Sequence, residues 1–596
     1  MPPSPPTYDP LSVDNYPTTR TFAPSSAPHP APLPSYWTAH FSSRLTHHNS
    51  APSVPLPREA DVVIIGSGLT GSTAAAELVD ALIASPVPGR KPTRIVVLEA
   101  RTFCSGATGR NGGHLTAYPI AHFEALQGRY GTEDAVRAVK LEDEAIEWLL
   151  GVVHQEGWEE EVDLQEGGGT LVLYDSPTQL ASVRASLYAA SKAGLDATKA
   201  KWVSPAEARE KWGAASEGAV MVPGNNLYPL KFVTKLFQRA QHRASATAAA
   251  AASEKGAVPP VDLQLFTHTV VGGVEAAVVA EEGRWTVKTD RGEIKTTHVL
   301  HATNAYLSSV LPSYTSSPSF PGILPTRGQV LSLLPLSIPR ASPFTQWDNA
   351  FSPSSASPDG KGINTYVFRR AYSAAGARAG DGRGEILIGG MRERAEGWEW
   401  GVADDSAVSG EVGTAVTESL GGSWPGLFEL LGEGGEKGDG DGKVGVEVRE
   451  EWTGIMGYRE EGNPIVGPVY IEGKKQEGQW VSAGYSGHGM PRAPPCARLV
   501  ASLIHHHLTS PPSSAPSPSS SASAAVPSAF RLPSHFPRHL LSTPSGKGDP
   551  HARLAEEGEG GGEGTGEQRK NKGRKEEGWV WVKKRVGEEG KVQRRL

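Results

Sequence analysis

Three glycines and one glutamate near the start of the chain have the types and spacing that bind a dinucleotide. Gly66, Gly68 and Gly71 form a GxGxxG pattern, and Glu99 follows the next apolar run. In such a pattern the first glycine permits a tight turn, the second lets the backbone approach a pyrophosphate, and the third lets a helix pack on a strand. The glutamate can accept hydrogen bonds from a ribose. The residues expected to bind the dinucleotide in this segment are Gly66, Gly68, Leu69, Thr70, Gly71, Glu99, Ala100 and Arg101.

This chemistry requires a strand before the glycines and a helix after them, and the sequence supplies both. Residues 61–65 and 94–98 are apolar, β-branched runs typical of strands buried on both faces of a parallel sheet. Between them, residues 72–82 are alanine-rich and predict a helix whose N-terminus offers free N–H groups and a positive dipole end to phosphates. Glu99 lies beyond the roughly 20 residues usual for this motif, and the loop rich in proline and glycine at 86–92 accounts for the excess. The segment predicts a βαβ unit.

A second glycine-rich loop, residues 104–114, decides which dinucleotide is expected. A nicotinamide dehydrogenase would normally continue into another helix at this point. An extended dinucleotide such as FAD instead needs a backbone that passes close to its ribityl chain and flavin edge, and Arg110 and Asn111 add hydrogen-bond donors. The loop therefore favours FAD. The residues expected to bind it here are Ser105, Gly106, Thr108, Arg110, Asn111, Gly112 and Gly113.

The two glycine-rich segments together resemble the D-amino-acid oxidase-like family of FAD-dependent oxidoreductases, which includes glycine, sarcosine and γ-glutamylputrescine oxidases. The motifs are most similar to those of fungal amine and γ-glutamylputrescine oxidase-like members. Further segments that resemble the family lie at 301–306, 325–330, 451–458, 463–468 and 480–490, so the resemblance spans roughly residues 35–506. It implies an α/β fold (α+β overall), with a Rossmann-type FAD-binding domain and an interleaved antiparallel-sheet substrate domain.

The resemblance also implies cofactor contacts outside the two loops. The backbone of Val270 would lie against the adenine, small residues at 302–304 would close over the phosphates, and glycines at 484–489 would leave room for the flavin. A helix expected at 494–507 would point its N-terminus at the pyrimidine end of the flavin, where negative charge accumulates on reduction. The residues assigned in this way are Val270, Ala302, Thr303, Asn304, Gly484, Gly487, His488, Gly489 and Met490.

A predicted strand at 365–370 carries the candidates for substrate binding. Strand alternation places Tyr366, Phe368 and Arg370 on one face. In carboxylate-binding members of the family an arginine at the Arg370 position pairs with the substrate's carboxylate, which a planar guanidinium can bind through two hydrogen bonds. Alternatively, Arg370 is an ordinary solvated arginine beside Arg369. The four residues predicted to position the substrate or set its protonation are Arg370, Tyr366, Tyr458 and His488. For His488, a structural or flavin-contacting role stays open as well.

The expected reaction is the oxidation of a C–N bond. Because the chain has one dinucleotide motif and no second one for a nicotinamide, the electron donor is expected to be the substrate itself. A hydride would pass from the carbon next to the amine to flavin N5, and water would hydrolyse the resulting imine, which requires no side-chain nucleophile. The expected partners are a small amine or amino acid, and oxygen or another electron acceptor. Two alternatives stay open: oxidation of a 2-hydroxy acid or polyol, and a flavin-binding protein without catalysis.

The flavin is predicted to be bound without a covalent link. Relatives that attach FAD through a histidine carry it in the second glycine loop, where this chain has Arg110. Relatives that attach it through a cysteine carry that residue before the Met-Gly-Tyr segment, where Gly454 stands. Cys104 and Cys496 match neither position. No metal site is predicted, because the acidic loop at 431–443 lacks the spacing of a calcium loop.

Composition limits the partners and the compartment. The chain has 596 residues, a formal net charge of −7 and a pI of about 6.2, which favours neither nucleic acid nor an anionic membrane as a partner. No apolar run is long enough to span a bilayer, and the N-terminus lacks the apolar core of a signal peptide. Two cysteines fit a reducing compartment. We therefore expect a cytoplasmic protein, with a peroxisomal location less favoured from the final residues 594–596.

Composition and motifs also predict how the chain divides into domains. Proline-rich and low-complexity stretches predict disordered ends, although apolar residues at 35–37, 530–541 and 579–586 are expected to dock locally. The predicted parts are a disordered segment at 1–33, an FAD-binding domain at 34–119, 221–310 and 441–506, a substrate domain at 120–220 and 311–440, and a mostly disordered tail at 507–596.

Overall fold

The computed structural model describes eleven stretches of the chain. These are residues 21–85, 92–117, 119–253, 261–277, 284–317, 320–335, 352–356, 363–370, 384–425, 446–509 and 536–542. The predictions for residues 1–20, for the acidic loop at 431–443 and for the apolar run at 579–586 lie outside these stretches.

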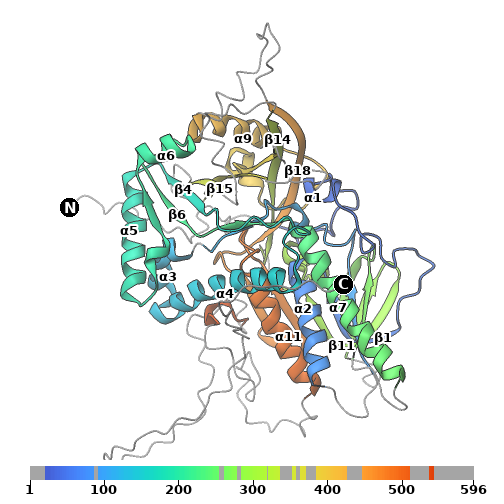
Figure 1. Ribbon diagram of the computed structural model, residues 1–596. Helices are drawn as coiled ribbons and strands as arrows, with labels where there is room; N and C mark the ends of the chain where they lie inside the picture. Colours follow the sequence, from blue (N-terminus) through green and yellow to red (C-terminus); the bar gives the residue numbers. More distant parts are fainter. Residues whose placement is uncertain are drawn as a thin grey trace, which may run out of the picture. The chain divides into compact units, whose positions relative to one another are not determined.

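Within the described residues, the first of two large sheets is built around the predicted βαβ unit (Figure 1). Its strands lie in the order β19-β20-β11-β1-β2-β8, with β10 pairing to β11 and β9 to β10. β1 pairs in parallel with both β2 and β11, and β2 with β8. The strands are β1 (Glu59–Ile65), β2 (Thr93–Leu98), β8 (Val261–Phe266), β9 (Val271–Ala276), β10 (Trp285–Thr289), β11 (Gly292–His301), β19 (Ile465–Ile471) and β20 (Lys474–Ala483).

The helix of the βαβ unit starts three residues earlier than predicted. α2 (Leu69–Ala84) begins directly after Gly68, which has an extended backbone and serves as its N-cap. Gly71 lies inside the helix, where a Cβ atom would collide with the carbonyl of Gly66. This close approach lets α2 lie directly on the strand, as the third glycine of the motif is expected to do. α2 packs against α7 (Pro229–Ser253) and α11 (Ala493–Thr509), so it is enclosed by helices that come from distant parts of the sequence.

The second sheet is largely antiparallel and has the order β18-β14-β17-β16-β15-β4-β6-β5. The predicted strand pair appears as β16 and β17, in which Val367 lies opposite Ile388. β14 and β18 form the longest pairing, from Leu324 opposite Tyr458 to Pro335 opposite Val446. The strands are β4 (Thr170–Tyr174), β5 (Lys201–Val203), β6 (Gly218–Val222), β14 (Leu324–Pro335), β15 (Ser352–Ala356), β16 (Ile363–Arg369), β17 (Ile386–Gly390) and β18 (Val446–Tyr458). Together, the two sheets confirm the predicted mixed α/β fold.

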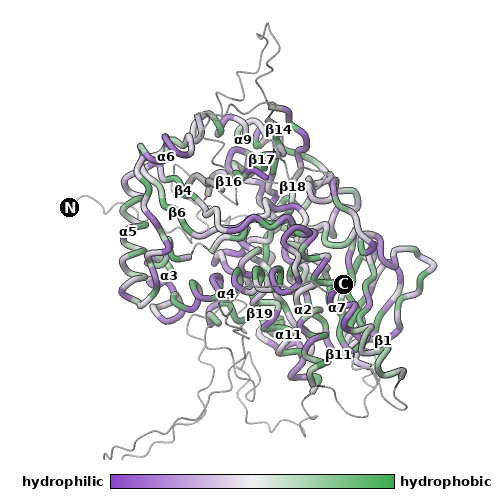
Figure 2. Tube along the Cα trace, viewed as in Figure 1, coloured by the Kyte–Doolittle hydropathy of each residue, from purple (hydrophilic) through white to green (hydrophobic). Residues whose placement is uncertain are grey.

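Two short strand pairs and several helices complete the described part. The short pairs are β3 (His114–Leu115) with β7 (Asn225–Asn226), and β12 (Thr315–Ser317) with β13 (Phe320–Pro321). Hydrophobic and hydrophilic positions alternate along the longer helices, as expected for helices that cover a sheet with one face (Figure 2). The remaining helices are α1 (Tyr36–Ala39), α3 (Phe123–Tyr130), α4 (Thr132–Glu156), α5 (Pro177–Lys192), α6 (Pro205–Trp212), α8 (Leu307–Val310) and α9 (Gly410–Ser423). None of the described helices combines the length and apolarity needed to cross a bilayer.

Two details differ from the predicted division into domains, and a third agrees with the expected docking of an apolar run. β18 lies in a segment assigned to the FAD-binding domain, yet it belongs to the second sheet because it pairs with β14 along almost its whole length. Residues 21–33, assigned to a disordered segment, are held by specific contacts, since Ser25 hydrogen-bonds Ser308 and the Leu33 N–H donates to the Asp405 carbonyl. Residues 536–542, assigned to the tail, are packed on the folded body, as expected for the apolar run that contains them.

Candidate cofactor and substrate site

A cavity of about 620 Å³ is lined by residues from both large sheets and from the loops between them. Its volume falls in the range of pockets that bind small molecules and cofactors. Gly71, Ser105, Gly484 and Arg370 are the predicted site residues that do not line it. The predicted residues that do line it are Gly66, Gly68, Leu69, Thr70, Glu99, Ala100, Arg101, Gly106, Thr108, Arg110, Asn111, Gly112, Gly113, Val270, Ala302, Thr303, Asn304, Tyr366, Tyr458, Gly487, His488, Gly489 and Met490.

At one end of the cavity, the first glycine turn leaves space that side chains would fill. Gly66 has a φ of +110°, and a Cβ atom there would lie 2.6 Å from the Ala302 carbonyl oxygen. No side chain caps α2 at Gly68, so the first turn of the helix presents backbone N–H groups. One of them, Leu69 N–H, donates to Thr108 Oγ1 at 3.1 Å. This bond brings the two glycine-rich loops into direct contact, and the turn has the form of an anion-binding helix terminus.

The carboxylate of Glu99 ties the end of β2 to this turn. One oxygen accepts from the N–H and the hydroxyl of Ser67, at 3.1 and 2.7 Å, and the other accepts from the Arg101 N–H at 3.1 Å. Glu99 is nearly buried and lines the cavity. It is therefore held in a fixed position beside the turn, where the sequence motif predicts a contact with a ribose.

The second glycine loop is anchored by a carboxylate that the sequence did not identify. Asp405 is buried, and both of its oxygens lie 2.9 Å from Arg101 Nη1, while one lies 3.3 Å from Arg110 Nε. Arg110 also donates to the carbonyls of Thr453 and Leu33. Burial lowers the pKa of Arg110 to about 10, against the attraction of Asp405. Most of the donors predicted for the cofactor at Arg110 are thus used to hold the loop itself.

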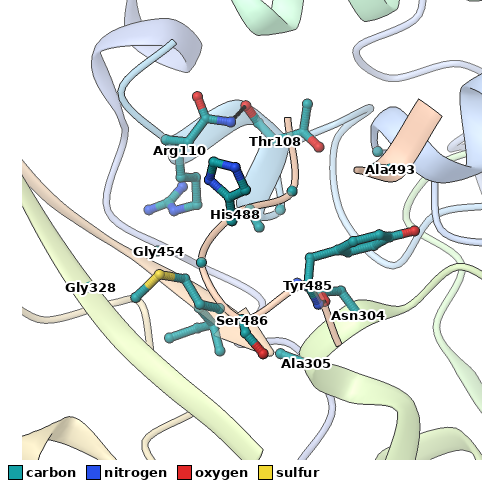
Figure 3. Close-up of a pocket in the computed structure, with 18 of the residues that line it drawn as sticks. Thr108, Arg110, Asn304, Ala305, Gly328, Gly454, Tyr485, Ser486, His488 and Ala493 are labelled. Atoms are coloured by element: carbon teal, nitrogen blue, oxygen red, sulfur yellow. Dashed lines mark hydrogen bonds between the residues drawn. The ribbon is translucent and has the colours of Figure 1, made fainter. Parts of the chain in front are cut away.

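The loop before α11 forms a further part of the cavity wall (Figure 3), and Thr70 of the first glycine turn donates its hydroxyl to that of Tyr485 in this loop at 3.1 Å. Asn304, with a φ of +47°, accepts the N–H groups of Gly484 and Tyr485 on its side-chain oxygen, at 3.0 and 3.3 Å. Ser486 has a φ of +51° and donates its N–H to the Gly457 carbonyl at 2.8 Å. Two residues in the left-handed region therefore shape the segment that leads into the N-terminus of α11, where Ala493 lines the cavity. Such strain is concentrated at functional sites.

His488, which is half-buried, belongs to a charge cluster around the buried carboxylate of Glu142. Its Nε2 lies 2.9 Å from Glu142 Oε2, and Arg492 Nε donates to Glu142 Oε1 at 2.7 Å. Burial opposes the ionisation of Glu142, but the charges of His488 and Arg492 outweigh it and lower the pKa of Glu142 to about 2. His122, which also lines the cavity, has its pKa lowered to about 4 by burial and by His488. Glu142 lies on α4 far from any motif, so no sequence pattern indicates its role.

The prediction that Arg370 faces the substrate is wrong. β16 places Tyr366 on the cavity, but Arg370, four positions further along the chain, does not line it. Instead, Arg370 Nη2 pairs with Asp163 Oδ2 at 2.5 Å, and its guanidinium lies over the ring of Tyr36 at 4.9 Å. Both charged side chains are almost completely buried. Arg370 is therefore a structural arginine that holds α1 against the body.

A different arginine, which the sequence analysis did not select, faces the cavity. Arg392 is half-buried, and its guanidinium lies over the rings of Trp400 at 4.3 Å and Tyr458 at 4.8 Å. Its Nη1 donates to the Trp398 carbonyl at 3.2 Å. No ion pair joins Arg392 to a carboxylate in the part of the chain that the structure describes. Its positive charge is therefore available to an anionic group in the cavity.

The backbone around Arg392 is strained. Met391, Trp398 and Glu399 have φ values of +57°, +59° and +60°. Side chains other than glycine rarely adopt this region, which costs on the order of 1–3 kcal/mol for each residue. The strain is held in place by the ion pair between Glu399 and Arg327 on β14. The fold thus maintains an unfavourable loop conformation beside the cavity.

Comparison with known proteins identifies the family. The chain belongs to the FAD dependent oxidoreductase family, whose sequence profile matches residues 61–503. It is 32% identical over 104 residues to "Probable oxidoreductase OrdL" of Rhizobium meliloti (strain 1021), an alignment that covers 17% of this chain and 22% of that protein. The chain therefore spans about a fifth of the length of this curated relative.

Solved structures share the fold at low sequence identity. Glycine oxidase from Geobacillus kaustophilus has a TM-score of 0.51 and 16% identity, covering 76% of this chain and 95% of the other. L-proline dehydrogenase from P. horikoshii has a TM-score of 0.50 and 18% identity, with coverage of 76% and 94%. L-amino acid deaminase from Proteus myxofaciens, in complex with anthranilate, has a TM-score of 0.50 and 13% identity, with coverage of 81% and 96%.

The residues around the cavity fit the FAD that this family uses. The glycine turn provides a cradle beside a helix N-terminus, as a pyrophosphate requires. Four buried polar atoms on lining residues have no hydrogen-bond partner among the described residues: Arg101 Nε, Arg110 Nη1, His114 Nε2 and Thr303 Oγ1. A ligand with phosphate, hydroxyl and ring carbonyl groups could pair them. Neither Cys104 nor Cys496 lines the cavity, which agrees with FAD held without a cysteine link.

Proposed function

We propose that the protein oxidises the C–N bond of a small amine that carries a carboxylate, such as an amino acid. Bound FAD supplies the acceptor for a hydride from the carbon next to the amine, and water hydrolyses the imine to a carbonyl compound and a free amine. Oxygen or another acceptor then takes up the electrons. In this proposal the protein belongs with the fungal amine and γ-glutamylputrescine oxidase-like members of the family, whose motifs it resembles. The observation that carries the proposal is that Arg392 lines the cavity and has no ion-pair partner among the described residues.

In this proposal Arg392 binds the substrate's carboxylate. The rings of Trp400 and Tyr458 would hold its guanidinium by cation–π contacts, and the N–H groups that are not bonded to the Trp398 carbonyl would bind the carboxylate. Tyr366 lies on the same side of the cavity, and burial raises the pKa of its hydroxyl, so this group stays protonated and can donate a hydrogen bond. Tyr366 lies on β16 and Arg392 follows the end of the neighbouring strand β17, so the second sheet would form the substrate side of the cavity.

The remaining predicted residues are proposed to hold the cofactor. The turn at residues 66–70 would bind the pyrophosphate, and Glu99 would bind the adenosine ribose. Val270 would lie against the adenine. His488 would lie at the flavin end, fixed by Glu142 and placed directly before the positive N-terminus of α11.

The test is anaerobic reduction of the bound flavin by matched substrates. The panel pairs each amino acid with the amine that lacks its carboxylate, and adds 2-hydroxy acids, which carry the same carboxylate without the nitrogen. We expect amino acids to bleach the flavin faster than the matched amines, and hydroxy acids to leave it oxidised. Bleaching by hydroxy acids alone would favour the alternative reaction, and an oxidised flavin with the whole panel would favour a protein without catalysis.

A further inference from the structure

A short C-terminal segment, residues 536–542, returns to the folded body after α11 has ended at Thr509. In Figure 1 it is the red segment beneath α4. Phe536, Leu540 and Leu541 are buried in the main hydrophobic core. Leu541 also forms a parallel bridge to Val466, and the Ser542 N–H donates to the Val466 carbonyl at 2.7 Å. The segment, here called the C-terminal clamp, therefore covers the edge strand β19 of the first sheet.

The clamp is also fixed to the start of α4. Asp134, which is almost completely buried, accepts the N–H groups of Arg538 and His539 at 2.7 and 3.0 Å. The second of its oxygens lies 2.5 Å from His539 Nδ1. One carboxylate thus holds two backbone donors and one ring nitrogen of the clamp. This is a specific attachment rather than a general apolar contact.

From His539, contacts continue toward the cavity. The ring of His539 stacks on Tyr130 with a centroid distance of 3.9 Å and an interplanar angle of 7°. The Tyr130 hydroxyl accepts from Asn463 Nδ2 at 2.8 Å. Asn463 Oδ1 accepts from Arg492 Nη1 at 3.2 Å. Asn463 and Arg492 both line the cavity, so the clamp lies only two residues away from its wall.

Arg492 connects this chain of contacts to the flavin end. It binds Glu142, and the other oxygen of Glu142 binds His488. A shift of Asn463 would remove an acceptor from Arg492, and the shared carboxylate would pass the change to His488. Because each group in the series has its partners fixed by geometry, the position of the clamp is coupled to the position of His488.

We propose that the C-terminal clamp is a positioning element for the cavity and that His539 is its positioning residue, acting through Tyr130 and Asn463 on Arg492 and His488. The inference rests on the proposed function only for its kinetic readout. The proposal gives the C-terminal clamp a role in shaping the cavity that none of the sequence motifs indicates.

The first test compares two truncations of the FAD-loaded protein. Ending the chain after Ser542 keeps the clamp, and ending it after Thr509 removes the clamp. We expect the first to match the full chain in flavin circular dichroism and in the dissociation constant of FAD, and the second to differ in both. Addition of the peptide FPRHLLS (residues 536–542) should restore the spectrum of the shorter protein. Two truncations with the same flavin spectrum as the full chain would overturn the proposal.

Since loss of the whole clamp exposes apolar surface, point variants of the full chain provide a second test. His539→Ala removes the stack on Tyr130, His539→Phe retains it, and Arg538→Ala is the matched control because only the backbone of Arg538 contacts Asp134. We expect His539→Ala to shift the flavin circular dichroism and to change kcat/KM about 2- to 30-fold, with partial rescue in His539→Phe. A His539→Ala protein that is less stable but has an unchanged flavin spectrum would contradict the proposal.

The readouts separate this proposal from the proposed function. The flavin spectrum and the FAD dissociation constant need no substrate, so the clamp can be tested even if no amine reduces the flavin. Conversely, an unchanged spectrum in His539→Ala together with normal amino-acid oxidation would reject the clamp and leave the proposed function standing.

Discussion

Two arginines of this protein lie among aromatic rings, and they do opposite things. Arg370 lies over Tyr36, Trp37 and Tyr228 at 4.9 to 5.2 Å, and Asp163 neutralises it at 2.5 Å. Arg392 lies over Trp398, Trp400 and Tyr458 at 4.3 to 5.8 Å, with no carboxylate partner among the described residues. The aromatic surroundings are alike, so under the proposed function the presence of an acid decides whether the cation is structural or binds a ligand. A similar rule applies to Arg492, which Glu142 neutralises.

Removing the charge of Asp163, the acid that neutralises Arg370, should have the largest effect on stability. Asp163→Asn leaves Arg370 and Lys231 without their carboxylate, because Lys231 Nζ also lies 2.7 Å from Asp163. Breaking one partner of a buried ion pair typically costs about 3–5 kcal/mol. We expect the free energy of unfolding, measured by denaturant titration, to fall by about that amount. The exposed Glu418→Gln should leave it within about 0.5 kcal/mol. Equal effects of both changes would show that the pair is not structural.

The pairing of Arg492 with Glu142 predicts that the stability of the protein depends on pH. The folded-state pKa of Glu142, about 2, lies below its ordinary value of 4.5. The ionised carboxylate therefore contributes stability that is fully present above about pH 4.5 and is lost as the pH falls toward 2, by on the order of 3 kcal/mol. Unfolding titrations across this range should show the loss in the native protein and a flatter profile in Glu142→Gln. The same profile in both proteins would contradict the assignment.

Replacing Arg392, the second arginine of the comparison, should change substrate binding rather than the stability of the fold. Arg392→Met keeps the apolar stem and removes the charge, so the loss of a charge-assisted hydrogen bond of about 1.5–3 kcal/mol should lower kcat/KM for an amino acid about 10- to 100-fold. The matched amine without a carboxylate should be oxidised at an unchanged rate. Arg394→Met, which alters an exposed neighbour, is the control. An equal loss for both substrates would reject Arg392 as the carboxylate site.

The smallest effect should come from the rings around Arg392. Trp398→Leu removes one cation–π partner, worth about 0.5–1 kcal/mol, so KM for the amino acid should rise about 2- to 5-fold without a change in kcat. Steady-state kinetics with the amino acid and its matched amine would measure the difference. A larger fall in kcat than rise in KM would indicate that Trp398 acts on the chemical step.

The comparison also shows what the sequence could and could not predict. The βαβ unit and its glycines were predictable, because local propensity and a fixed spacing determine them. The strand containing Tyr366 was predictable too, but the pairing of Arg370 with Asp163, 207 positions away along the chain, was not. Asp163, Asp405 and Glu142 were missed because each pairs with an arginine far away in sequence, and a lone acid in a helix or loop carries no local pattern.

The three-way anchoring of Arg110 has a consequence for how the protein matures. Its side chain is held by Leu33, which lies 77 positions earlier in the chain, by Thr453, which lies 343 positions later, and by Asp405. Closing such long loops is slow, because their entropy is lost before the contacts form. During synthesis the second glycine loop should therefore reach its final shape only after β18 has emerged, and a nascent chain would not capture the flavin until nearly all of the fold is assembled.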